Sequence, residues 1–342
     1  MRVATLSGVL FAISLSLPAW PATEGDAPGP PPNAIASIRA RRCESNPLID
    51  FTTSPSLGNN INGPSVIKAP SWVEKPLGKY YMYFAHHGGK HIRLACADAL
   101  EGPWRVHEPG TLALHQAKGF SGHIASPDIH VDEERKEVLM YFHGPATGGQ
   151  KTGVATSKDG LTFNPSEAIL GDFYFRVFPW KDACYSVAKD GNTGWGSLNR
   201  SPDGRSPFEK RREFIRNMRH AAVMIKDGHL LVFYSRVQDA PERIVVATVP
   251  LTGDWKTWKA SEPIDVLQPE AAYEGIAHAN KPSGYGPATR VRQLRDPCLF
   301  QDDGRTYLFY SIAGESGIAM AELDIVMKPE ATPGGDEPPP AR

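Results

Sequence analysis

The sequence is poor in cysteine, in long apolar runs and in excess charge of either sign. Only 4 of its 342 residues are cysteine, and no C-x-x-C pair or H-E-x-x-H motif is present, so the common zinc and redox motifs are excluded. The 37 Lys and Arg nearly balance the 38 Asp and Glu, for a net charge of -1. Since no basic run stands out, neither nucleic acid nor an anionic membrane surface is expected as a partner.

The four cysteines lie far apart in the sequence, at Cys43, Cys96, Cys184 and Cys298. Export would permit a structural disulfide between two of them. Three of the four lie within apolar, strand-like runs, which equally favours buried free thiols. Sequence alone does not decide the pairing, and both states stay open.

The N-terminal apolar run is too short to span a membrane. Residues 6–17 carry no charge, follow the basic start Met1-Arg2 and precede the small residues of 18–22, a pattern typical of a secretory signal peptide. A secreted or periplasmic protein is therefore expected. The predicted organisation is a signal peptide (1–22), a Pro/Gly-rich linker (23–44), one catalytic domain (45–327) and a disordered tail (328–342).

What the sequence does contain is one aromatic-rich run repeated four times, while helical patterns are nearly absent. The runs are Tyr80–Phe84, Val138–Phe142, Leu230–Tyr234 and Thr306–Tyr310. Counting thirteen residues back from the aromatic at the fourth place of each run gives Pro70, Asp128, His220 and Asp296. A repeated β unit with a polar residue at one fixed point predicts a β-propeller, whose blades share a central pocket.

The strand signals predict an all-β, five-bladed β-propeller with four-stranded antiparallel blades. The first blade is expected to enter near Trp72, and the fourth to begin at Arg219 and to close near residues 255–258. The fifth begins at Arg295, and an early strand at residues 49–51 is expected to complete its sheet.

Three motifs carry a family resemblance. They are Ser126-Pro127-Asp128-Ile129, Arg295-Asp296-Pro297 before an aromatic strand, and Gly317-Ile318-Ala319-Met320-Ala321. The chain resembles the five-bladed β-propeller glycosidases of the furanosidase superfamily, closest to glycoside hydrolase families 43 and 117. That resemblance implies an exported, inverting glycoside hydrolase that cleaves a poly- or oligosaccharide with carboxyl groups in the central funnel.

The resemblance makes Asp128 the catalytic base and gives Asp296 the role of gripping sugar hydroxyls and stabilising the transition state. Glu274, in a long loop between the last two blades, is the candidate proton donor, and Glu315 is a weaker one expected at an outer turn. Each has a structural alternative. Asp128 could cap a turn, Asp296 could pair with Arg295, and Glu274 could simply be solvated.

Five further residues are candidates for substrate binding: Arg176, His220, Arg219, His130 and Trp72. The arginine inside the apolar run Phe175–Val177 needs a partner if it is buried, and either a sugar acid or an inter-blade salt bridge would serve. The alternatives for the others are a histidine hydrogen-bonded within a sheet and a tryptophan that fills a blade core.

One departure from the family pattern affects the mechanism. In family 43 the first blade supplies the base aspartate, but the equivalent point by the thirteen-residue count is Pro70-Ser71, which has no carboxylate. The roles are therefore rotated around the ring, or the acid is a histidine, or the propeller only binds carbohydrate. No cofactor and no metal site are expected, although a calcium ion on the axis stays open.

Overall fold

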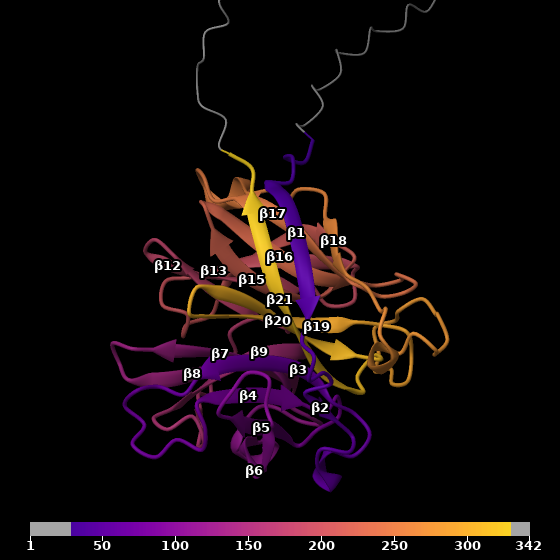
Figure 1. Ribbon diagram of the computed structural model, residues 1–342. Helices are drawn as coiled ribbons and strands as arrows, with labels where there is room; N and C mark the ends of the chain where they lie inside the picture. Colours follow the sequence, from indigo (N-terminus) through magenta and orange to yellow (C-terminus); the bar gives the residue numbers. More distant parts are fainter. Residues whose placement is uncertain (1–28, 330–342) are drawn as a thin grey trace, which may run out of the picture. The chain divides into compact units, whose positions relative to one another are not determined.

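The structure, a computed structural model, describes residues 29–329, which form five antiparallel β-sheets arranged as a propeller (Figure 1). This confirms the predicted fold class. The predicted signal peptide (1–22) and all but the first two residues of the predicted tail (328–342) lie outside the described residues. Within residues 29–329, no helix is long and apolar enough to cross a membrane.

Blades 1 to 4 are each one sheet of four consecutive strands. Blade 1 contains β3 (Asn62–Lys68), β4 (Tyr80–Ala85), β5 (His91–Ala97) and β6 (Arg105–Ala113). Blade 2 contains β7 (Ala125–Asp132), β8 (Glu137–Ala146), β9 (Gly149–Ser157) and β10 (Asn164–Pro165). Blade 3 contains β11 (Arg176–Trp180), β12 (Ala183–Lys189), β13 (Trp195–Ser201) and β14 (Glu209–Arg216). Blade 4 contains β15 (Met218–Lys226), β16 (His229–Arg236), β17 (Ile244–Pro250) and β18 (Ile264–Leu267).

Blade 5 joins the two ends of the domain. It contains β19 (Arg295–Asp302), β20 (Arg305–Ile312) and β21 (Gly317–Met327), with β1 (Ile35–Arg42) and β2 (Ile49–Asp50) both paired to β21. Figure 1 shows β1 and β21 side by side although they lie at opposite ends of the sequence. The predicted linker 23–44 is thus wrong over residues 35–42, which form a strand, whereas the expected strand at 49–51 is confirmed as β2.

The remaining elements are four short 3-10 helices: η1 (Pro55–Leu57), η2 (Leu114–Gln116), η3 (Trp255–Thr257) and η4 (Ala272–Glu274). Two of the strand predictions need correction here. The first blade begins with β3 at Asn62 rather than near Trp72, and the fourth is closed by β18 rather than by residues 255–258, where η3 lies. All four cysteines are free thiols, so the disulfide alternative is wrong.

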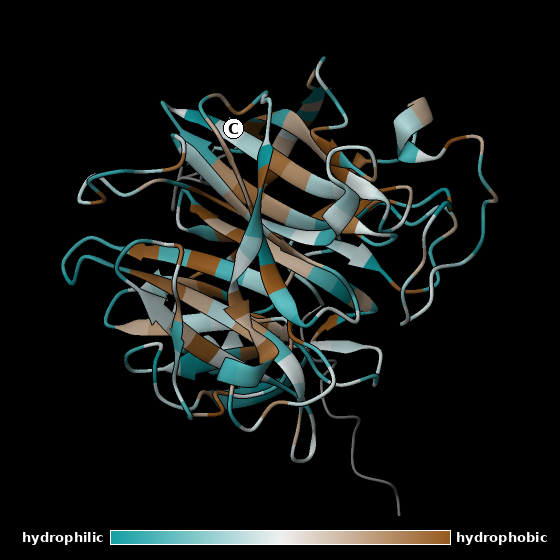
Figure 2. Cartoon of the chain, turned by 90° about the horizontal axis from the view of Figure 1, so that it is seen from below, coloured by the Kyte–Doolittle hydropathy of each residue, from teal (hydrophilic) through white to brown (hydrophobic). Residues whose placement is uncertain are grey.

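The core lies between neighbouring blades, where the faces of adjacent sheets pack on each other. The repeated aromatic runs are confirmed as the second strands β4, β8, β16 and β20, and Tyr83, Phe142, Phe233 and Phe309 are almost completely buried in these layers. Figure 2 shows hydrophobic colour concentrated on the strands and hydrophilic colour on the connecting loops. Burial of these large side chains is the main favourable term that holds the blades together.

The innermost strands β3, β7, β15 and β19 share one irregularity. Each has a register shift near its start, between Asn62 and Ser65 in β3 and between Arg295 and Cys298 in β19, for example. Such a bulge turns a side chain out of the regular alternation of a strand. The bulges therefore decide which side chains reach the propeller axis.

The thirteen-residue count does not give equivalent positions, because the loop between the first and second strands differs in length from blade to blade. The residues that face the fourth-place aromatics across the ladder are Ser65, Asp128, Ala222 and Cys298. His220 and Asp296 therefore lie two positions before the residue equivalent to Asp128. Pro70 lies beyond the end of β3 altogether.

Removing β1 should destabilise the domain. A chain that starts at Glu44 lacks the outer strand of blade 5 and exposes the edge of β21, whereas a chain that starts at Pro31 keeps every strand. We expect the shorter chain to unfold roughly 5–10 °C lower, because it loses the buried Ile35 and a full ladder of hydrogen bonds. Equal unfolding temperatures by circular dichroism would show that residues 31–43 are a linker after all.

Candidate functional site

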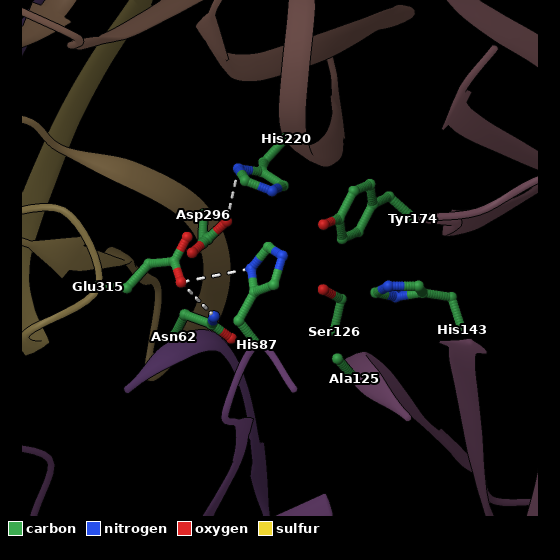
Figure 3. A pocket seen from close by; sticks show the side chains of 9 residues that line it. All are labelled: Asn62, His87, Ala125, Ser126, His143, Tyr174, His220, Asp296 and Glu315. Atoms are coloured by element: carbon green, nitrogen blue, oxygen red, sulfur yellow. Dashed lines mark hydrogen bonds and ion pairs between the residues drawn. The ribbon is translucent and has the colours of Figure 1, made fainter. Parts of the chain in front are cut away.

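A small polar pocket lies on the propeller axis, at the start of the innermost strands. We call it the axial pocket, and it is lined by Asn62, His87, Ala125, Ser126, His143, Tyr174, His220, Asp296 and Glu315 (Figure 3). These residues come from all five blades or from the loops that join their strands. Residues far apart in the sequence thus converge here, as the propeller prediction requires.

Three of these side chains lie on left-handed backbone, two of them (Ser126 and Asp296) at the bulges and Tyr174 just before β11. Ser126, Tyr174 and Asp296 have positive φ angles of 48°, 61° and 48°, a left-handed conformation that costs free energy for any residue other than glycine. The equivalent position in blade 1 is Gly63, with φ 62°. Blade 1 therefore lacks a carboxylate at this point, as predicted, but the residue responsible is Gly63 and not Pro70.

Asp296 and His220 form a fully buried acid–imidazole pair. His220 Nδ1 lies 2.5 Å from Oδ1 of Asp296, and Ser311 donates a hydrogen bond to Oδ2 at 2.9 Å. Burial lowers the pKa of His220 to about 4 against the opposing effect of Asp296, so the imidazole is neutral at pH 7. Burial alone would raise the pKa of Asp296, but His220 and Arg295 outweigh it and keep the carboxyl ionised.

Glu315 is the second carboxylate of the pocket and is held by four groups. Arg295 Nη1 donates to Oε1 at 3.0 Å, and Asn60 and Asn62 donate to Oε2 at 2.6 and 3.0 Å. The imidazole of His87 lies 3.4 Å from the same oxygen and is 28% exposed, whereas Glu315 is 1% exposed. Burial raises the pKa of Glu315, but His87 and Arg295 offset this and hold it at about 2.

Behind the pocket, buried arginines compensate the carboxylates. Arg295 Nη2 lies 2.8 Å from Glu242, which also accepts a hydrogen bond from Ser235 at 2.7 Å. Arg219 lies 3.5 Å from Glu242 and 3.7 Å from Glu315, and it donates to the carbonyl of Gly286 at 2.8 Å. Burial raises the pKa of Glu242. The side chains of Arg219, Glu242, Arg295 and Glu315 are all at most 1% exposed.

Aromatic and imidazole rings form the opposite wall. The Tyr174 ring lies 4.7 Å from His220 and 4.4 Å from His143, between centroids. His143 is buried, and its Nδ1 has no hydrogen-bond partner among the described residues. Burial lowers the pKa of His143 well below its usual value, so it faces the pocket as a neutral ring. The pocket has a free volume of only about 10 Å³, enough for one water molecule.

The predicted site residues fall into two groups on the axis. Asp296, His220 and Arg219 lie in or directly behind the axial pocket. Asp128, His130 and Arg176 line a different space, which we call the rear cavity, further along the same innermost strands. The predicted base and the predicted sugar-gripping aspartate are therefore both axial but do not share one pocket.

Glu274 and Trp72 do not reach the axis. The carboxylate of Glu274 is fully buried and pairs with Arg42 at 2.8 Å and with the Tyr310 hydroxyl at 2.9 Å. It ties β1 to the loop before β19 and lines neither space, so the predicted proton donor is better described as a structural ion pair. Trp72 donates to the carbonyl of Lys158 at 3.0 Å and packs in a blade core, the alternative stated for it.

Sequence reasoning ranked Glu315 only as a weaker proton donor at an outer turn, which is wrong because its carboxylate lines the axial pocket, and it missed Tyr174, His143 and Glu242. Part of this could have been found from the X-Pro pairs. Gly63-Pro64, Ser126-Pro127 and Asp296-Pro297 each occupy the bulge, so aligning the prolines gives the equivalence that the aromatic count did not. Glu315 has no such signal, because a loop contact from its N–H to the carbonyl of Ala288 positions it.

Metal binding finds no support at the axis. In residues 29–329 no group of three or more His, Cys, Asp or Glu side chains is placed to hold a metal ion. Of the two carboxylates of the axial pocket, Asp296 pairs with His220 and Glu315 with Arg295. These pairings leave no oxygen cluster of the kind that calcium prefers.

A relative exists among curated proteins. The "Uncharacterized protein R118" of Acanthamoeba polyphaga mimivirus is 35% identical over 341 residues, covering 85% of this chain and 94% of that protein. This chain belongs to the same family. No family model matches the chain, so membership brings no assigned activity.

Solved structures relate the family's fold to glycoside hydrolases. The GH43_1 enzyme from Xanthomonas citri complexed with xylose is 11% identical, with a TM-score of 0.55 over 85% of this chain and 90% of that chain. A putative glycosidase from Bacteroides thetaiotaomicron is 13% identical, with a TM-score of 0.57 over 83% and 96%. CoXyl43, a GH43 β-xylosidase/α-arabinofuranosidase from a compost metagenome, is 13% identical, with a TM-score of 0.55 over 85% and 96%. These likenesses establish the five-bladed propeller fold.

Stability should fall as the pH is lowered from 7 to 5. The folded-state pKa of His220 is about 4 against 6.5 in the unfolded chain, and that of His143 is also lowered, so the unfolded state binds more protons in this range. His143→Gln should make unfolding temperature less dependent on pH between 7 and 5. The same slope in both proteins, measured by thermal unfolding at each pH, would contradict a buried neutral His143.

Breaking the buried ion pairs should cost far more than breaking a surface pair. Glu242→Gln leaves Arg295 and Arg219 undercompensated, and we expect a loss of about 3–5 kcal/mol in the free energy of unfolding. The matched control is Glu322→Gln, whose pair with Arg41 at 3.1 Å is exposed and worth about 0–1 kcal/mol. Urea unfolding measures both, and similar small losses would show that the cluster around Arg295 adds nothing.

Proposed function

We propose that this protein is a glycoside hydrolase whose chemistry takes place at the axial pocket. The observation that carries the proposal is the convergence of two ionised carboxylates, Asp296 and Glu315, with a half-exposed imidazole, His87, on the axis of a five-bladed propeller. The fold is that of the family 43 structures above, one of which is complexed with xylose. We therefore propose a carbohydrate substrate, namely a poly- or oligosaccharide.

Asp296 is the proposed base. Its carboxylate is ionised, and Ser311 and His220 fix its orientation, so it is suited to take a proton from a water molecule. The free volume of the pocket admits one water beside it. Attack by that water on the anomeric carbon would invert the configuration, as the family resemblance implies.

His87 is the proposed proton donor, because neither carboxylate can serve. Asp296 and Glu315 are both held ionised, whereas His87, whose Nδ1 lies 3.4 Å from Glu315, carries an imidazole, a side chain that serves as a general acid in proteins. His87 is also the group of the three with the most exposure, so it can reach a glycosidic oxygen outside the narrow pocket.

Export, which the N-terminal residues predict, would bring the enzyme to extracellular glycans.

A second function has one observation in its favour. The free volume of about 10 Å³ does not admit a sugar ring unless side chains move. A propeller that only binds carbohydrate, at its rim, would need no deeper pocket. The two functions differ in whether any glycan is cleaved.

Asp296→Asn should lower kcat/KM by about 10²–10⁴-fold on any glycan that the wild type cleaves. The matched control is Asp302→Asn at the far end of β19, where the carboxylate pairs with Lys68 outside the pocket. The assay screens plant, algal and bacterial glycans, and proton NMR of the first product reports the anomer. A retained anomeric configuration would exclude inversion, and binding without cleavage of any glycan would favour the second function.

The role of His87 has its own test in the same assay. His87→Ala should lose most activity on natural glycosides but keep it on aryl glycosides whose leaving group needs no proton. An equal loss on both substrate types would remove His87 as the donor.

A further inference from the structure

The rear cavity is lined by the innermost strands of all five blades. It is bordered by Pro64–Val66, Asp128–His130, Arg176–Val177, Ala222–Val223 and Cys298–Leu299, and none of these residues lines the axial pocket. Its volume is about 170 Å³, compared with about 10 Å³ for the axial pocket. On this measure about 10–15 Å³ holds one water molecule, so the rear cavity has room for several.

One wall of the rear cavity carries polar side chains, some of whose atoms have no hydrogen-bond partner among the described residues. Asp128 Oδ2 accepts from the Val177 N–H at 2.8 Å and lies 2.9 Å from His130 Nε2, while Oδ1 has no hydrogen-bond partner among the described residues. Arg176 is 5% exposed and donates through Nε to Ala221 and through Nη1 to Phe175, both at 2.9 Å. Its Nη2 has no partner within residues 29–329. An acceptor and a donor therefore remain for a ligand.

The charged groups of this wall favour a ligand without net charge. The pKa of Asp128 is lowered, because His130 and Arg176 outweigh the raising effect of burial, so the group is an anion. Asp128 and Arg176 carry opposite charges, so the wall has no net charge that would attract an anion or a cation. A neutral ligand that both donates and accepts hydrogen bonds satisfies both groups.

The remaining walls are aliphatic, with Val66, Ile129, Ala222, Val223 and Leu299. A sugar ring matches such a space, because its hydroxyls can meet the polar wall while its C–H groups pack on the aliphatic one. His130 is 34% exposed, so the cavity communicates with solvent on its own side. We infer that the rear cavity is a second ligand site, which binds one neutral monosaccharide through Asp128 and Arg176.

This inference goes beyond the proposed hydrolysis and does not depend on it. The bound sugar would sit further along the strands than Asp296, and no bond is made or broken. If no glycan is cleaved in the screen, the inference of a rear site still stands. If the rear cavity binds no sugar, the proposal of hydrolysis at the axial pocket still stands.

The test is isothermal titration, with saturation-transfer NMR for weak binding, using D-xylose, L-arabinose, D-galactose, inorganic phosphate and calcium chloride as probes. We expect one of the three sugars to bind, and Asp128→Asn to weaken it roughly ten-fold or more. Asp132→Asn, an equal charge change on the same strand beyond the cavity, should leave binding unchanged. Asp296→Asn should also leave it unchanged, which separates the rear site from the axial pocket.

Val223→Phe, which fills the cavity from a half-buried position, is a second variant that keeps the test valid if Asp128→Asn fails to fold. Thermal unfolding reports folding of each variant. The inference is overturned if none of the three sugars binds, if phosphate or calcium binds more tightly than the sugars, or if binding survives in folded Asp128→Asn or Val223→Phe.

Discussion

The buried guanidinium of Arg295 is the group on which the axial pocket depends. Taking an arginine out of water costs several kcal/mol, and the carboxylates that face it, Glu242 and Glu315, offset that cost together with a hydrogen bond to the side-chain oxygen of Gln293. The same pairs lower the pKa of Glu315, and Arg295 also helps to keep its neighbour Asp296 ionised. The same ion pairs therefore hold blades 4 and 5 together and set the charges in the axial pocket. A change that loosens this junction alters the charge available for chemistry.

The fold could be predicted because its signal is local and repeated. Runs such as Tyr80–Phe84 and Thr306–Tyr310 alternate with turn residues, and this is enough to indicate strands, blades and a ring. The residues of the site were harder to predict from the sequence. The loop after β19 (residues 303–304) is shorter than the loop after β7 (residues 133–136), so the same aromatic spacing reaches Asp128 in one blade and a residue two positions earlier, Asp296, in the other. The adjacent prolines do record the equivalence. For Glu274 and Glu315 no spacing could decide, since contacts from Arg42 and from Arg295 place them.

The likeness to family 43 structures covers most of the chain at 11–16% identity, which is enough for the ring but not for its chemistry. In a propeller the axial residues sit at a few bulge positions, so single substitutions change the chemistry while the blades stay the same. Here Gly63 leaves one such position without a side chain, and just before the innermost strand of blade 3 Tyr174 supplies a phenol. An activity for this family must accordingly be argued from Asp296, Glu315 and the histidines around them.

The pairing of β1 with β21 affects biosynthesis. Ile35 pairs with Met327, so among the strands of residues 29–329 the first to be synthesised pairs with the last, and its edge stays uncovered until then. A strand with an unpaired edge can form hydrogen bonds with other nascent chains. β1 carries Arg39, Arg41 and Arg42, and like charges of this density oppose stacking of identical strands. The arginines that later form ion pairs with Glu322 and Glu274 thus also protect the unfinished polypeptide against self-association.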